Sequence, residues 1–156
     1  MRFLFYDRVR EIGGGRIVGT KAFSLSEQYL SAHFDRAPIV PGTILLEAMV
    51  QLLGWAIVHA HEFKISAIVS LVEGLTVADT RLRPGFEARI TGEILSTSAT
   101  DSLGRAWLEV GDARIATAER VIYSHFPAPD PEALRRLFRY CGGLDDGGSR
   151  TPEALA

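Results

Sequence analysis

Residues 41–61 read PGTILLEAMVQLLGWAIVHAH, and this stretch is the strongest indication of the architecture of the chain. Apart from Glu47 and Gln51, nearly every position is apolar or glycine, so apolar side chains would cover almost every face of a helix. A helix that is apolar on all sides is a buried one. A proline followed by a glycine suits the first turn. We therefore expect a central helix from Gly42 to about His61, wrapped by the rest of the chain.

The segments on both sides of this helix predict strands. Two strands joined by three glycines should precede it, and a short helical turn over Ser24 to Leu30 should follow them. Turns are expected at Arg83-Pro84-Gly85, at residues 100–104 and at Gly111. A run of strands around one helix indicates an α+β domain with an antiparallel sheet curled around that helix. The expected strands are residues 3–12, 16–23, 66–72, 86–96, 106–110 and 112–125.

The chain of 156 residues suits one compact domain. Beyond Pro127 its character changes, because a Pro-Asp-Pro break precedes a short amphipathic helix over residues 132–140. We predict a domain over residues 1–126 and a C-terminal extension over residues 127–156, whose end is a loose tail. The residues expected on the apolar face of the extension helix are Leu134, Leu137, Phe138 and Cys141.

Composition excludes several classes of function. A formal net charge of -2 gives no reason to expect nucleic acid or an anionic membrane as a partner. The single cysteine, Cys141, cannot form an internal disulfide. The first residues lack the basic and apolar regions of a secretory signal. We expect a protein of the cytoplasm that lies outside the membrane.

Glu47 is the first chemically unusual residue, because it interrupts an apolar helix. A buried carboxylate is costly, and burial raises its pKa, which lets it donate a proton near neutral pH. Gln51 lies one turn later on the same face, within reach of a hydrogen bond. The alternative is that Glu47 faces solvent at the edge of the helix.

His33 and Gly42 supply the other parts of an acid–base site. His33 precedes the helix on an expected loop, and its ordinary pKa suits general base catalysis. The backbone N–H groups at Gly42 begin the helix and can bind a polarised carbonyl oxygen. A base, an acid and a donor to an oxyanion are what removal of water from a 3-hydroxyacyl thioester requires.

This segment resembles the 3-hydroxyacyl-acyl-carrier-protein dehydratases of bacterial fatty-acid synthesis. Their signature runs His-Phe-Pro-Gly-x-Pro-x-x-Pro-Gly, then four residues, then Glu-Ala-x-x-Gln. The sequence departs from it at Asp35-Arg36, where the family has Pro-Gly. The matching positions here are His33-Phe34, Pro38, Pro41-Gly42, Glu47-Ala48 and Gln51.

The resemblance implies a hot-dog fold, and a homodimer in which His33 of one subunit faces Glu47 of the other. Further assembly into a trimer of dimers is common in such proteins. It also implies that Gly42, Gln51 and Val40 bind the substrate, with the Gly42 amide on the thioester carbonyl. The glutamate indicates the branch that only dehydrates. No metal or dissociable cofactor is implied, since the acyl chain arrives on the phosphopantetheine of acyl-carrier protein or coenzyme A.

Three alternatives remain open at the level of sequence. A hot-dog thioesterase would use the helix carboxylate to activate water, and a catalytically silent acyl-binding subunit would explain Asp35-Arg36. A metal site of His33, His59, His61 and Glu62 is disfavoured, because residues two apart on a helix do not share a face. In the extension, Arg135, Arg136 and Arg139 could dock an acidic carrier protein instead of covering an oligomer surface.

Overall fold

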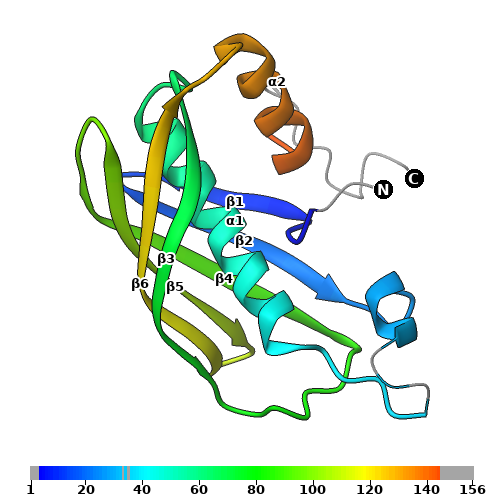
Figure 1. The fold of residues 1–156 in the computed structure, drawn as a ribbon. Coiled ribbons are helices and arrows are strands. Elements are labelled where there is room, and N and C mark those ends of the chain that lie inside the picture. Colours follow the sequence, from blue (N-terminus) through cyan, green and yellow to red (C-terminus); the bar gives the residue numbers. More distant parts are fainter. Residues whose placement is uncertain (1–3, 33, 35, 145–156) are drawn as a thin grey trace.

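The structure, a computed structural model, describes residues 4–32, 34 and 36–144. One long helix lies in the concave side of a curled sheet, and a second helix lies over one end of the first (Figure 1). The expected α+β class and the hot-dog arrangement are therefore confirmed. The elements are β1 (Arg8–Gly13), β2 (Arg16–Phe23), η1 (Gln28–Ala32), α1 (Gly42–Ala60), β3 (Ile65–Val77), β4 (Phe86–Thr97), β5 (Asp101–Val110), β6 (Ala113–Pro127) and α2 (Pro131–Gly142).

The sheet is antiparallel, with its six strands in the order β1-β2-β4-β5-β6-β3. The strand β3 comes directly after α1 in the chain but pairs only with β6, at the far end of the sheet. Their register runs from Ile65 opposite Pro127 to Val77 opposite Ala116. The free edges of the described sheet are thus β1 and β3.

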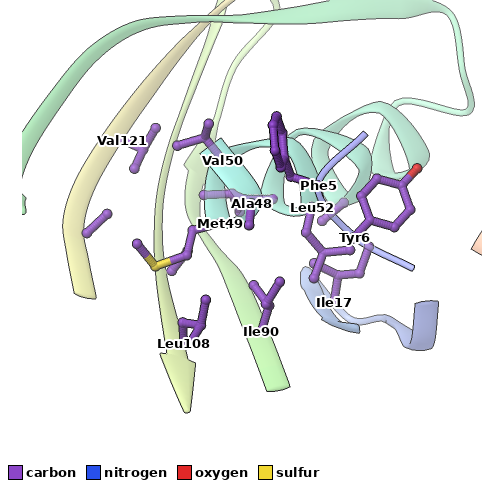
Figure 2. Packing of buried hydrophobic residues seen from close by; sticks show 14 of the residues in the cluster. Phe5, Tyr6, Ile17, Ala48, Met49, Val50, Leu52, Ile90, Leu108 and Val121 are labelled. Carbon is purple, nitrogen blue, oxygen red and sulfur yellow. The ribbon is translucent and has the colours of Figure 1, made fainter. Parts of the chain in front are cut away.

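The helix α1 fills the sheet and supplies the centre of the core. It contacts all six strands, and Figure 2 shows Ala48, Met49 and Leu52 among side chains from several strands. By length and composition alone α1 could span a membrane, but half of its most apolar window is buried inside the protein. Burial of each large apolar side chain contributes about 1.5–3 kcal/mol, which accounts for this helix as a core helix.

Two glycines of the sheet allow α1 to approach it closely. A Cβ added at Gly92 of β4 would lie 3.1 Å from the backbone of Leu53, and one at Gly104 of β5 would lie 2.8 Å from a Leu53 methyl group. A side chain at either position would push the helix away from the sheet. The turn predicted at residues 100–104 is wrong, because Gly104 pairs with Ile94 inside β5. The glycine serves close packing there, and the turn lies before Asp101.

The expected first strand also begins later than predicted, at Arg8 rather than residue 3. Phe5 and Tyr6 leave the line of the sheet and are buried, 6% and 1% exposed, in the core against α1. The backbone N–H of Phe5 donates to the side chain of Gln51 at 2.9 Å instead of to a neighbouring strand. This contact with α1 holds Phe5 away from the sheet, and hydrogen bonding to β2 begins at Asp7, whose N–H donates to the Thr20 carbonyl at 2.8 Å.

The extension helix α2 has well-defined ends. The Asp130 carboxylate accepts a hydrogen bond from the Ala133 N–H at 2.9 Å, and Gly143 ends the helix in the left-handed conformation. Phe138 is only 3% exposed, whereas Leu137 is 43% exposed, so the expected apolar face is correct for Phe138 and wrong for Leu137. The predicted loose tail lies, from residue 145 onward, outside the described residues.

Candidate active site

An apolar groove of about 510 Å³ opens between one face of α1 and the edge strand β3. On α1 the lining residues recur every three or four positions, as one helical face requires. Among the described residues that line the groove, Glu47 is the only charged one. The lining residues are Leu46, Glu47, Val50, Gln51, Gly54, Trp55, Val58, Ser66, Ala67, Ile68, Val69, Val72, Tyr123 and Leu134.

Glu47 lies near the start of this groove and is held there by Gln51. The side-chain amide nitrogen of Gln51 donates to Glu47 Oε1 at 2.7 Å, and the side-chain oxygen Oε1 of Gln51 accepts the N–H of Phe5. The predicted hydrogen bond between residues one turn apart is therefore present. Glu47 is half-buried, so it belongs to the groove and not to the fully exposed edge of the helix.

Tyr123 of β6 is a residue of the groove that the sequence analysis missed. It is 1% exposed, and its hydroxyl donates to the backbone carbonyl of Val50 at 2.7 Å. Burial raises the pKa of Tyr123 well above its ordinary value, and the nearby Glu47 carboxylate adds to the effect. The phenol therefore stays neutral and fixes the middle of α1. Val121 and Tyr123 are two residues apart in β6, and this period of two was the sequence signal that indicated an inward-facing Tyr123.

The N-terminus of α1 lies just before Glu47 in the chain. Pro41 precedes the helix in an extended conformation and makes no side-chain cap. A Cβ added at Gly42 would lie 3.1 Å from a methyl group of Val77, so glycine allows the end of β3 to pack here. Glu47 follows Gly42 by five residues, or roughly 7.5 Å along the helix axis.

The other predicted site residues fall in different places. His33 and Asp35 lie outside the described residues, and Arg36 is exposed. Val40 is 2% exposed, and its N–H donates to the Leu82 carbonyl at 2.8 Å. Its side chain belongs to the core and is not part of the groove lining.

The histidines near the end of α1 are engaged in other contacts. The His59 ring packs against Phe63 and Phe138. His61 Nε2 lies 2.8 Å from the Thr97 hydroxyl. Within residues 4–32, 34 and 36–144, no group of three or more histidine, cysteine, aspartate or glutamate side chains is arranged to hold a metal. These contacts give His59 and His61 structural roles.

The matches to known proteins show the family of the chain. Residues 1–83 match the model of the FabA-like domain, and these residues include η1, α1 and β3. The 3-hydroxyacyl-acyl-carrier-protein dehydratase FabZ of Thermoanaerobacter pseudethanolicus is 34% identical over 122 residues, which cover 75% of this chain and 83% of that protein. The chain belongs to this dehydratase family. Dehydratases of this family are hydro-lyases, and the chain is therefore an enzyme of this class.

Solved structures share the fold of this FabA-like protein at low sequence identity. The dehydratase heterocomplex ApeI:P of Xenorhabdus doucetiae superposes with a TM-score of 0.65 at 16% identity, covering 86% of this chain and 89% of that one. A thioesterase of Haemophilus influenzae superposes with a TM-score of 0.61 at 8% identity, covering 78% and 79%. The two likenesses show the fold, which dehydratases and thioesterases share.

Proposed function

We propose that the protein removes water from 3-hydroxyacyl thioesters, giving trans-2-enoyl thioesters, with Glu47 as general acid and His33 as general base. One observation carries the proposal: a single carboxylate, oriented by Gln51, stands near one end of an apolar groove. An acid beside the reacting carbons and an apolar wall beyond them suit a substrate with a polar thioester head and an apolar tail.

The chemistry divides between three groups. His33 takes the proton from C2 of the substrate, and the electrons of that C–H bond form the C2–C3 double bond. The C3–O bond breaks as Glu47 gives its proton to the departing hydroxyl, which leaves as water. Negative charge builds on the thioester oxygen, and the Gly42 N–H at the start of α1 stabilises it. Solvent then returns a proton to Glu47 and removes one from His33.

The substrate reaches the site as a thioester. The proposed carrier is the phosphopantetheine of acyl-carrier protein or of coenzyme A, with the acyl chain along the groove and no metal or further cofactor. Fatty-acid synthesis, as in the FabZ relatives, is the proposed context. Among the arginines proposed to dock the carrier, Arg136 is exposed. The Arg135 guanidinium packs over the Phe63 ring at 5.1 Å and therefore already has a structural contact.

We propose a homodimer formed through the edge of β3, with sites shared between the subunits. This edge carries exposed aliphatic side chains: Ile68 is 57% exposed and Leu71 is 44% exposed. An unpaired strand edge with an apolar surface is a surface that a second chain covers. A second copy along β3 would close the open side of the groove, and the family resemblance implies that it supplies its own His33 to the site of Glu47.

The test follows the loss of enoyl absorbance when crotonyl and longer enoyl thioesters are hydrated, on both coenzyme A and acyl-carrier protein. The wild type should be active, while Glu47→Gln and His33→Ala should each lose at least about a hundredfold in kcat. Circular dichroism should show that both variants remain folded. Turnover near the wild-type rate in either variant would overturn the assignment of that residue.

A further inference from the structure

The extension helix α2 contributes to the lining at the far end of the groove. Leu134 of α2 lines the groove together with Trp55 and Val58, which belong to the last turns of α1. Glu47 lies two to three turns earlier, at the other end. Figure 1 shows α2 lying over the end of α1 that is remote from its N-terminus.

Aromatic contacts hold α2 firmly in this position. Phe138 is 3% exposed, and its ring lies 5.1 Å from the Trp55 ring and 5.7 Å from the Phe63 ring. At the start of the helix, Arg135 donates to the backbone carbonyl of Glu62 at 3.3 Å. Leu134 lies one turn before Phe138, so this anchor fixes the place of Leu134 as well.

The middle of the groove is kept open by Gly54. Its nearest contact would be an ordinary one, because a Cβ added there would lie 3.5 Å from a ring carbon of Tyr123. Alanine therefore fits, whereas a larger side chain would project into the groove and divide it.

We infer that α2 limits the length of the acyl chain that the groove accepts. Leu134 contacts the end of this acyl chain, and Gly54 leaves room for the acyl chain to pass. The inference rests on the proposed function, because it takes the occupant of the groove to be the acyl tail of the thioester. From Glu47 to Val58 the helix rises about 17 Å. At roughly 1.25 Å per extended carbon, this length accommodates about a dozen carbons.

The test measures binding of saturated acyl-pantetheine thioesters, from butyryl to palmitoyl, which can be neither dehydrated nor hydrated. Affinity for the wild type should rise about fourfold per methylene and then level off once the chain reaches Leu134. In Leu134→Ala the affinity should keep rising for about three more acyl carbons, the number of carbons that the substitution removes from the side chain. Leu134→Phe and Gly54→Leu should end the rise at shorter chains, while Leu137→Ala, on the exposed face of α2, should leave it unchanged.

Opposite shifts in the two Leu134 variants cannot come from general loosening of α2. Equal profiles in the wild type, Leu134→Ala and Leu134→Phe would overturn the inference. An affinity that does not rise with chain length would also overturn it, and would indicate that side chains of a second copy fill the groove. Length-dependent binding without any turnover would instead contradict the proposed dehydration and leave the role of α2 standing.

Discussion

Gln51 connects Glu47 to the N-terminal segment of the chain. Its amide nitrogen donates to Glu47 Oε1 at 2.7 Å, and its amide oxygen accepts the N–H of Phe5 at 2.9 Å. The second contact determines which end of the amide faces the carboxylate, because a nitrogen in place of the oxygen could not accept this N–H. Glu47 is therefore held in one orientation by a segment that lies far away in the sequence.

Replacement of Gln51 should lower activity without unfolding the protein. In Gln51→Leu, Glu47 loses the donor that orients it, so kcat should fall about ten- to hundredfold while KM changes less. Steady-state hydration of an enoyl thioester measures both constants. Gln28→Leu, at an exposed position of η1, is the matched control and should behave as the wild type. A normal kcat in Gln51→Leu would show that the hydrogen bond has no part in catalysis.

Lys21 should stabilise the fold through two carboxylates. It is 7% exposed, and its Nζ lies 2.6 Å from Glu27 and 3.2 Å from Asp7. Lys21→Met should lower the free energy of unfolding by about 2 kcal/mol, less than a fully buried pair because both carboxylates reach solvent. Urea unfolding measures the change. Lys64→Met, which breaks an exposed pair with Glu62, should cost much less; equal losses in the two variants would refute the special role of Lys21.

The same lysine predicts a dependence of stability on alkaline pH. Burial alone would lower the pKa of Lys21, but the hydrogen bond that Lys21 donates to Glu27 and the charges of Asp7 and Glu27 outweigh it, and the net pKa is raised. A raised pKa in the folded state gives stability that is fully present below the unfolded value of about 10.4 and is lost as pH rises through the folded value. The difference between the wild type and Lys21→Met should therefore be constant near neutral pH and shrink above about pH 10.4. A difference that grows there would contradict the pairing.

Two glycine-to-alanine substitutions should have opposite effects on stability. At Gly104 the new Cβ would lie 2.8 Å from the Glu93 carbonyl oxygen and from a Leu53 methyl group, so Gly104→Ala should cost about 1–3 kcal/mol. At Gly54 there is room, and alanine favours the helix, so Gly54→Ala should gain up to about 1 kcal/mol. Thermal unfolding of both variants is the measurement. An unchanged stability in Gly104→Ala would show that this glycine is not needed for close packing, and a loss in Gly54→Ala would show that the helix has no room there.

The edge of β3 should carry the dimer interface. Leu71→Glu places a charge on a side chain that is 44% exposed in the single chain and lies outside the groove lining, and it should give monomers that have lost activity because the sites are shared. Leu95→Glu, at a 48% exposed position of β4, should remain dimeric. Sedimentation equilibrium distinguishes these states. A Leu71→Glu variant that stays dimeric would contradict the interface, and active monomers would contradict the sharing of sites.

The fold could largely be predicted because its main signals are local. The apolar run from Gly42 onward gave the central helix, observed as Gly42–Ala60, and β2 begins and ends where alternation predicted it. Residues 100–104 misled the prediction, because a glycine in a polar stretch is typical of a turn. Whether such a glycine turns the chain or admits Leu53 depends on a helix some fifty positions earlier, which no local pattern contains.

The candidate site was predictable only in part, for a similar reason. The pairing of Glu47 with Gln51 follows from helical spacing, and the structure shows it. The second bond of Gln51, to Phe5, joins residues 46 positions apart and could not be read from spacing. Leu134 reaches the groove only because Phe138 packs against Trp55, a contact between distant segments. The role of His33 stays a prediction from the sequence.

The proposed dehydration is tested most directly by separating the products that the wild type and Glu47→Gln form from one 3-hydroxyacyl-pantetheine thioester. We predict that the wild type forms the enoyl thioester with loss of water, that the thioester bond stays intact, and that the variant leaves the substrate unchanged. Release of the free thiol would identify a thioesterase. An unchanged substrate with the folded wild type would identify a silent acyl-binding subunit, and either result would contradict the dehydration proposed here.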